Sequence, residues 1–284
     1  MRDTVRIIIP TRDPKNCGRI VHDLLEDGWH EIVVVHPRSA VSIPGVTSIQ
    51  TAGLLSPAAA RNRAATGATT SLLCFIDDDA ICTSATLDTL VHACIQDTVV
   101  AVGPLLGDGP RDPYWRRCMH RIMAGPQFET APSTPTERLM SMCMVVRTTV
   151  FEEMRGFDET FSPAGEDTEL SMRLATRGRL IIDGNARIMH RPDPDSWWIA
   201  TRRLYRYGVA WAQITAERPR PSSWVRRLPT VLRWCLVCLI PYMAIIDAIR
   251  ATSIAYWAGY AWLRVAWYIG WLTSPITPAR SSTC

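Results

Sequence analysis

The sequence predicts an α/β protein, in which an open, mostly parallel sheet with helices on both faces is followed by hydrophobic helices. Three observations support this prediction. Short, continuous apolar runs, as expected of buried parallel strands, alternate with segments of helical periodicity. Polar residues follow several of these runs directly. The last 60 or so residues consist mainly of apolar stretches, and nine of the 11 Trp lie from Trp197 onward.

Helix starts in the first part of the chain carry recognisable caps. Asp13 followed by Pro14 is typical of an N-cap and a first helical residue, and Ser56-Pro57 repeats the pattern. Gly28 and Gly67 are suited to end these two helices. The expected strands cover Val5–Pro10, Ile32–Val35, Val46–Ile49 and Leu72–Ile76.

The second part of the chain is less regular. Residues 107–135 are rich in Pro and Gly and predict a long loop of the kind that often covers a substrate site. The other expected elements are a helix over 84–96, a strand over 98–103, a strand over 139–146, a short helix with a capping box from Thr149 and Glu152, a helix over 165–178, a strand over 186–189 and a helix over 196–216.

Three aspartates, Asp77, Asp78 and Asp79, follow the fourth expected strand directly. Adjacent carboxylates repel one another unless a cation neutralises them, and oxygen ligands suit Mg²⁺ or Mn²⁺. The alternative is a solvated turn that caps the next helix. Because ligands bind beyond the carboxyl ends of parallel strands, we expect residues 10–13 and 36–39 to line the same crevice.

Two further elements carry candidate chemistry. Glu166 and Asp167 fall in the first turn of an expected helix, where acids complement the helix dipole or where one carboxylate can act as a general base. His190 closes an apolar, strand-like segment and is either structural or a third metal ligand.

Together these pieces resemble the family 2 glycosyltransferases, which have the GT-A fold, over roughly residues 5–208. Ile7-Ile8-Ile9-Pro10-Thr11 resembles the family's first strand and nucleotide loop, and Ala60-Arg61-Asn62 its Ala-Arg-Asn helix motif. Phe75-Ile76-Asp77-Asp78-Asp79 resembles its DxD strand end. Gly156-Phe157-Asp158-Glu159 with Glu166-Asp167 resembles its acceptor-side motif, and His190 falls where many members place a metal-binding His.

The resemblance implies an inverting transferase that moves a sugar from a nucleotide-sugar donor to an acceptor hydroxyl with the help of Mn²⁺ or Mg²⁺. Asp79, Asp77 and His190 would hold the metal. The nucleotide would contact Pro10, Thr11, Arg12, Arg61, Asp77 and Asp78. Asp167, with Glu166 beside it, would take the proton from the acceptor hydroxyl in a single displacement.

One departure from the family pattern concerns the nucleotide base. Members usually carry an acidic pair after the second strand, where this chain has His36-Pro37-Arg38-Ser39, so guanosine and thymidine donors stay open beside uridine. Two other functions are alternatives. A sugar nucleotidyltransferase normally has a Gly-rich loop after the first strand, which Thr11-Arg12-Asp13-Pro14 is not. A non-catalytic membrane-bound module would have no need to retain every acidic motif.

The end of the chain has a different composition. Residues 197–284 contain 11 Arg, no Lys and two acids, a net charge of +9, whereas the first 196 residues carry −5. A basic, Trp-rich, apolar segment suits an anionic membrane surface better than nucleic acid. We expect a catalytic domain over 1–216, a basic Pro-rich linker over 217–228, a hydrophobic helical hairpin over 229–273 and a tail over 274–284.

The hairpin has three interpretations. Val231–Ile246 and Ala251–Leu272 could form a transmembrane hairpin, helices in the membrane interface, or a soluble helical pair. Arg226, Arg227 and Arg233 agree with a cytoplasmic catalytic domain under the positive-inside rule. The N-terminus enters a strand without an apolar leader. We therefore expect a cytoplasmic domain on the inner face of the cell membrane, acting on a lipid-linked or membrane-proximal acceptor.

Overall fold

The computed structural model of this chain describes residues 2–38, 43–109, 112–124, 133–161, 164–191, 196–217 and 238–274. It forms two compact units. The sheet unit comprises Met1–Gly109 with Gln127–Asp193, and the helical unit comprises Pro110–Pro126 with Pro194–Cys284. Helix α7 (Trp197–Glu217), expected at the end of the first domain, groups with the helices that follow it.

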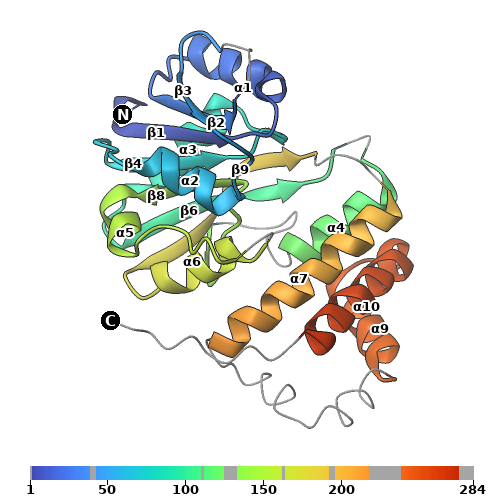
Figure 1. The fold of residues 1–284 in the computed structure, drawn as a ribbon. Coiled ribbons are helices and arrows are strands. Elements are labelled where there is room, and N and C mark those ends of the chain that lie inside the picture. The colour runs from blue at the N-terminus through green and yellow to red at the C-terminus, as the bar shows by residue number, and fades with distance from the viewer. Residues whose placement is uncertain are drawn as a thin grey trace. The chain divides into compact units, whose positions relative to one another are not determined.

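A nine-stranded sheet forms the centre of the sheet unit (Figure 1). Its order is β3-β2-β1-β4-β8-β6-β9-β5, and β7 pairs with β9. The strands are β1 (Val5–Pro10), β2 (Ile32–Pro37), β3 (Thr47–Thr51), β4 (Leu72–Ile76), β5 (Ala80–Ile81), β6 (Val99–Gly107), β7 (Thr134–Thr136), β8 (Cys143–Arg147) and β9 (Arg179–His190). The strands expected at Val5–Pro10 and Leu72–Ile76 therefore have the predicted bounds.

The prediction of a mostly parallel sheet is confirmed in part. Strands β1 to β4 pair in parallel, and β6 pairs in parallel with β9, but β8 enters antiparallel between β4 and β6, and β5 and β7 both run antiparallel to β9. The direction of β8 was not predicted, because a strand buried on both faces has the same continuous apolar sequence in either direction.

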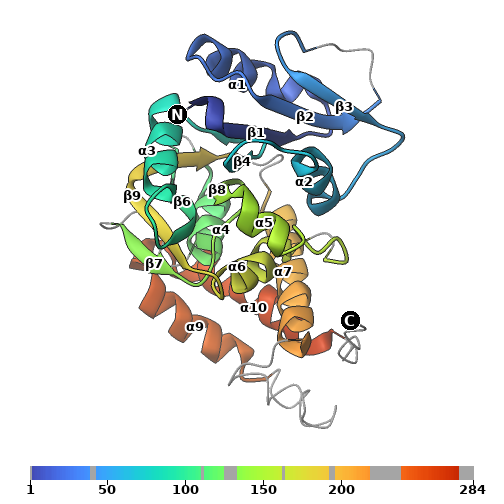
Figure 2. The same cartoon turned by 90° about the vertical axis from the view of Figure 1, so that its left-hand side faces the viewer.

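Helices cover both faces of this sheet, as predicted (Figure 2). They are α1 (Pro14–Glu26), α2 (Pro57–Ala65), α3 (Ser84–Cys94), α5 (Thr148–Glu153) and α6 (Glu166–Leu174), with a 3₁₀ turn η1 over Arg2–Thr4. The predicted caps are present, because Asp13 accepts from the backbone N–H of Lys15 and Ser56 from that of Ala59. The capping box is wrong, because α5 begins at Thr148 and follows Arg147 without a side-chain cap.

The core that supports the site lies between the sheet and α2, α5 and α6. Phe75 of β4 is fully buried, and its ring centroid lies 5.3 Å from that of Phe151 and 5.1 Å from that of Phe157. Burying one such side chain contributes about 1.5–3 kcal/mol. The strand that carries the three aspartates is therefore anchored immediately before its end.

The long loop expected over residues 107–135 contains the helix α4 (Tyr114–Ala124) and the short strand β7. The Pro and Gly residues concentrate at the two ends of this segment and leave 11 helix-compatible residues between them. The strand expected over 139–146 begins only at Cys143. The strand expected over 186–189 extends back to Arg179, through a bulge opposite Pro104 and Leu105 of β6.

The helical unit contains α4, α7, α9 (Ile240–Ala251), the 3₁₀ turn η4 (Ile254–Tyr256) and α10 (Trp257–Thr273). Helices α7 and α10 approach so closely that a Cβ atom on Gly208 would lie 2.0 Å from the carbonyl oxygen of Trp267. Among the described residues, no helix combines the length and the apolar character needed to cross a membrane. Residues 218–237 and 275–284 lie outside the described residues. They comprise the expected linker apart from Glu217, the first part of the expected hairpin over 229–237, and the expected tail apart from Ser274.

Candidate active site

The pairing of β5 with β9 places His190 beside the three aspartates. After β4 ends at Ile76, the chain turns through Asp77, Asp78 and Asp79 into β5, and Ala80 pairs with His190. The backbone N–H of Arg191 donates to the carbonyl oxygen of Asp79 at 2.9 Å. As a result, the Nε2 atom of His190 lies 3.0 Å from Oδ1 of Asp79.

Asp77, Asp79 and His190 form a candidate metal centre. Each offers one ligand atom, and these atoms all lie within 4.8 Å of one another. The His190 side chain is 8% exposed, and those of Asp77 and Asp79 are 26% and 32% exposed. Carboxylate oxygens suit Mg²⁺ and Mn²⁺, and imidazole is a common metal ligand, so this donor set fits a divalent cation.

Asp78 takes a different position from its two neighbours. Its Oδ2 atom accepts a hydrogen bond of 2.5 Å from Oγ1 of Thr11, which is buried directly after β1. Burial raises the pKa of Asp78, and the bond from Thr11 opposes the rise. Pro10, half-buried, and Arg12, exposed, flank Thr11 at the same strand end. The structure thus brings the predicted loop 10–12 next to the aspartates.

Arg61 connects two motifs that are far apart in the sequence. From α2, its Nη2 donates to Oδ1 of Asp77 at 2.5 Å and its Nη1 to Oε1 of Glu166 at 3.1 Å. The Arg61 side chain is only 3% exposed. Although burial opposes its charge, Asp77 and Glu166 keep the pKa of Arg61 above its ordinary value. The positive charge of Arg61 is therefore paired with these two carboxylates.

Glu166 and Asp167 begin α6 after Gly165, whose φ of 101° lies in the left-handed region. Glu166 is buried against Arg61, and burial, with repulsion from Asp167, raises the pKa of Glu166 to about 7. Asp167 is half-buried, and its Oδ1 accepts from the backbone N–H of Thr168 at 2.6 Å. Asp167 is therefore the more accessible of the two carboxylates.

Asn62 has a structural role that the sequence did not reveal. Its Nδ2 donates to the carbonyl oxygen of Phe157, and its Oδ1 accepts from the N–H of the same residue, both at 2.8 Å. The turn before Phe157 needs a glycine, because Gly156 has a φ of 67° and a Cβ there would lie 2.5 Å from Oδ1 of Asn62. Adjacent residues on α2 thus bind the aspartate turn and the acceptor-side motif.

His36, which stands where an acidic pair was expected, points into the protein. It is 1% exposed, its Nδ1 lies 2.7 Å from the carbonyl oxygen of Pro37, and its Nε2 lies 2.7 Å from Oγ of Ser48 on β3. Both ring nitrogens are therefore engaged within the β2–β3 pair. Arg38 is exposed, and the expected crevice residue Ser39 lies outside the described residues.

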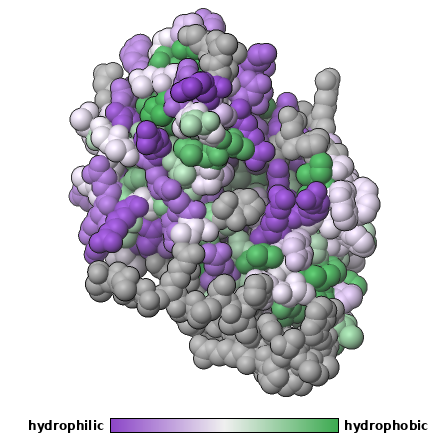
Figure 3. Space-filling model, in the orientation of Figure 1, coloured by the Kyte–Doolittle hydropathy of each residue, from purple (hydrophilic) through white to green (hydrophobic). Residues whose placement is uncertain are grey.

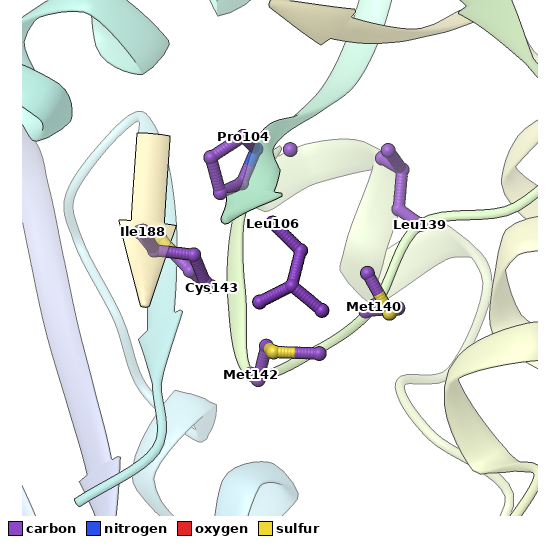
Figure 4. A pocket seen from close by; sticks show the side chains of 8 residues that line it. Pro104, Leu106, Leu139, Met140, Met142, Cys143 and Ile188 are labelled. Atoms are coloured by element: carbon purple, nitrogen blue, oxygen red, sulfur yellow. The ribbon is translucent and has the colours of Figure 1, made fainter. Parts of the chain in front are cut away.

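A small apolar pocket lies next to the aspartate turn, with Leu106, Leu139 and Met142 among its lining side chains (Figure 4). The carbonyl oxygen of Met142 accepts from the N–H of Asp77 at 3.0 Å, and the N–H of Leu139 donates to Oγ of Ser171 on α6 at 3.0 Å. The segment 139–142 therefore links the aspartate turn to the helix that begins with Glu166 and Asp167.

Residues 5–210 match the family described as glycosyltransferase like family 2. Two curated relatives are each 29% identical to this chain. One is the pre-mycofactocin glycosyltransferase of Mycobacterium tuberculosis, over 176 residues that make up 59% of this chain and 36% of the relative. The other is the O-antigen biosynthesis protein RfbC of Myxococcus xanthus, over 171 residues, 49% of this chain and 13% of the relative. The chain thus spans only a minor part of either relative.

Solved structures share the fold. The mannosyltransferase PcManGT from Pyrobaculum calidifontis, in complex with GDP-Man and Mn²⁺, has a TM-score of 0.65 at 17% identity, covering 95% of this chain and 87% of that one. S. aureus TarS 1–349 in complex with UDP-GlcNAc has a TM-score of 0.53 at 11% identity, covering 94% and 92%. Since the family match extends over most of its length, this chain belongs to the family 2-like glycosyltransferases and has their GT-A fold.

Proposed function

We propose that this protein is an inverting, metal-dependent hexosyltransferase that moves a sugar from a nucleotide-sugar to an acceptor hydroxyl by a single displacement. The observation that carries the proposal is the cluster of Asp77, Asp79 and His190, whose ligand atoms lie within 4.8 Å of one another. Asp167, a half-buried carboxylate in a neighbouring motif, supplies a base.

Asp79, Asp77 and His190 would hold Mn²⁺ or Mg²⁺, and the bound ion neutralises charge on a nucleoside diphosphate leaving group. Pro10, Thr11, Arg12 and Asp78 lie at the end of β1 and the adjoining turn, where the nucleotide would lie. We assign Arg61 a positioning role in place of direct nucleotide binding, since its guanidinium is buried between Asp77 and Glu166.

Asp167 would accept the proton of the acceptor hydroxyl, so that the oxygen attacks the anomeric carbon from the face opposite the diphosphate. Such a base typically contributes a factor of about 10²–10⁴ in rate. Glu166 is less suited to this step, because its carboxylate is buried and bonded to Arg61. Its contribution would be to keep Arg61 in place and, through Arg61, the carboxylate of Asp77.

The donor base and the acceptor stay open within this proposal. PcManGT is in complex with GDP-Man and TarS with UDP-GlcNAc, so GDP- and UDP-sugars are the first donors to test. Three features remain predictions. They are a lipid-linked hydroxyl acceptor, membrane association through residues 229–273, and a position at the cytoplasmic face of the membrane.

The test uses the full chain with UDP-, GDP- and dTDP-sugars and Mn²⁺. Binding is followed by the thermal shift and turnover by release of the nucleoside diphosphate. Asp79→Ala should abolish metal-dependent stabilisation by the donor, whereas Asp97→Ala, at an exposed acid away from the site, should keep it. If the wild type neither binds nor cleaves any donor, the proposal fails and a non-catalytic binding module is favoured. Retained anomeric configuration in the product would refute inversion.

A further inference from the structure

Charge is divided sharply between the two units. Residues 110–126 and 194–284 of the helical unit hold 15 Arg and no Lys, against four acids, for a net charge of +11. Since the whole chain carries +4, the sheet unit carries −7. A unit of this charge attracts anionic partners strongly at physiological ionic strength and repels a second copy of itself.

Exposed apolar side chains concentrate on the same unit. On the face shown in Figure 3, hydrophobic residues (green) are exposed between hydrophilic ones (purple). Of 15 large apolar side chains that are exposed among the described residues, 11 belong to the helical unit. Among these are Trp197 and Trp198 of α7 and Trp262 of α10, whose rings contact one another. An exposed apolar patch combined with positive charge indicates an interaction surface.

Beyond its first residue, Ile240, which is buried, helix α9 has small residues inside and several large apolar ones outside. Ala244 and Ala248 are fully buried, whereas Tyr242 is 67% exposed and Ile245 and Ile249 are each 50% exposed. The spacing of the last three, i, i+3 and i+7, places them along one side of the helix. A helix that packs only against its own protein normally buries the large apolar side chains and exposes the small or polar ones.

The charges on α9 leave its outer face without a free acid. Its only acid, Asp247, accepts from Arg264 of α10 at 2.7 Å and from the hydroxyl of Tyr268 at 2.8 Å, so its negative charge is neutralised within the unit. Arg250 at the end of the helix is exposed. Elsewhere in the same unit, Arg202 and Arg206 of α7 are exposed as well.

We propose that the outer face of α9, formed by Tyr242, Ile245 and Ile249, binds the surface of a membrane that contains anionic phospholipids. Apolar side chains would enter the boundary between headgroups and acyl chains, and the arginines would contact lipid phosphates. The charge of +11 favours this partner over the same face of a second copy of the chain, which carries the same charge. The proposal goes beyond the transferase reaction and does not depend on it.

The test is flotation of the full chain with two kinds of vesicle, one of phosphatidylcholine alone and one with about a third phosphatidylglycerol. The wild type should bind the anionic vesicles, and binding should weaken at about 1 M salt, where charges are screened over ~3 Å. Ile245→Glu with Ile249→Glu should lower the partition coefficient by about tenfold or more. The matched control, Leu54→Glu with Ile95→Glu on the sheet unit, changes side chains of 59% and 45% exposure and should bind as the wild type does.

Equal binding by the α9 variant and the wild type, equal binding to neutral and anionic vesicles, or no binding by the wild type would each overturn the proposal. So would a wild type that self-associates without lipid and becomes monomeric in the α9 variant, because a second copy would then occupy the face. If the variant does not fold, hydrogen exchange of the wild type decides. Exchange over residues 240–251 should slow with anionic vesicles, and unchanged exchange there refutes the proposal.

Discussion

Replacing Arg61 by Met would remove the buried cation that lies between Asp77 and Glu166 while keeping most of the side-chain volume. In the wild type the guanidinium donates to Asp77 at 2.5 Å and to Glu166 at 3.1 Å. The variant leaves two carboxylates without this partner, one of them almost fully buried. Breaking a buried ion pair from one side typically costs about 3–5 kcal/mol.

The lower end of this range is expected for Arg61→Met, because Asp77 is 26% exposed and water can solvate its carboxylate. We expect the free energy of unfolding to fall by about 3 kcal/mol. Glu166 can reduce its own part of this cost by taking up a proton, since the pKa of Glu166 is already about 7 and would rise further without Arg61.

Urea denaturation followed by circular dichroism measures the loss, and titration with Mn²⁺ measures the metal affinity, which should fall because Asp77 loses its orientation. Adding Glu166→Gln to Arg61→Met should recover part of the stability, with a coupling energy of about 0.5–3 kcal/mol. A positioning role predicts a lower kcat and a weaker metal affinity together. If Arg61→Met keeps its stability and metal affinity and raises only the donor KM, Arg61 is a nucleotide ligand and this reasoning is refuted.

Three further predictions concern Asp167, Glu166 and the packing of α7 against α10. Asp167→Asn should keep metal-dependent donor binding, as measured by thermal shift, and should lower kcat by a factor of about 10²–10⁴. Normal transfer by this variant would exclude Asp167 as the base. Glu166 has a folded-state pKa of about 7, above its ordinary 4.5, so the folded protein holds a proton that the unfolded chain has released. The contribution of Glu166 to the unfolding free energy should therefore be greatest below pH 4.5 and should decrease as the pH rises to about 7. Urea denaturation at pH 5 and 7.5 measures this decrease, and Glu166→Gln should remove it. In Gly270→Ala the new Cβ would lie 2.1 Å from the carbonyl oxygen of Tyr205, so we expect the free energy of unfolding to fall by about 1–3 kcal/mol, as measured by thermal unfolding. The control, Gly18→Ala, has open space around the new Cβ and should be neutral or slightly stabilising.

Local signals in the sequence predicted much of the sheet unit. The caps at Asp13 and Ser56 act within three residues, and the strand Leu72–Ile76 is a continuous apolar run, so both could be recognised from neighbouring residues alone. The direction of β8 could not, because a fully buried strand carries no directional signal. Helix α4 was missed because the Pro and Gly residues that flank it dominated the composition of the segment.

The candidate site was predictable as a set of residues but not as a set of contacts. The resemblance to the family placed Asp79 and His190 together, whereas β5, the strand that brings them close, has only two residues and no periodicity to detect. The bond between Arg61 and Glu166 joins residues 105 positions apart, and no spacing rule connects them. The burial of His36 depends on Ser48 of the next strand, which the sequence does not pair with it.

The two-residue strand β5 connects cation binding with the stability of the sheet. It is held by the pairing of Ala80 with His190 and of Ile81 with Met189, and a shift of this register by one residue would move Asp79 away from His190, because the pairing of β9 with β6 keeps β9 in place. A cation bound by Asp77, Asp79 and His190 would cross-link two distant chain segments at this weak point, and its binding energy would add to the stability of the folded state. Removing the cation with a chelator would therefore weaken the pairing of β5 with β9 more than that of the longer strands.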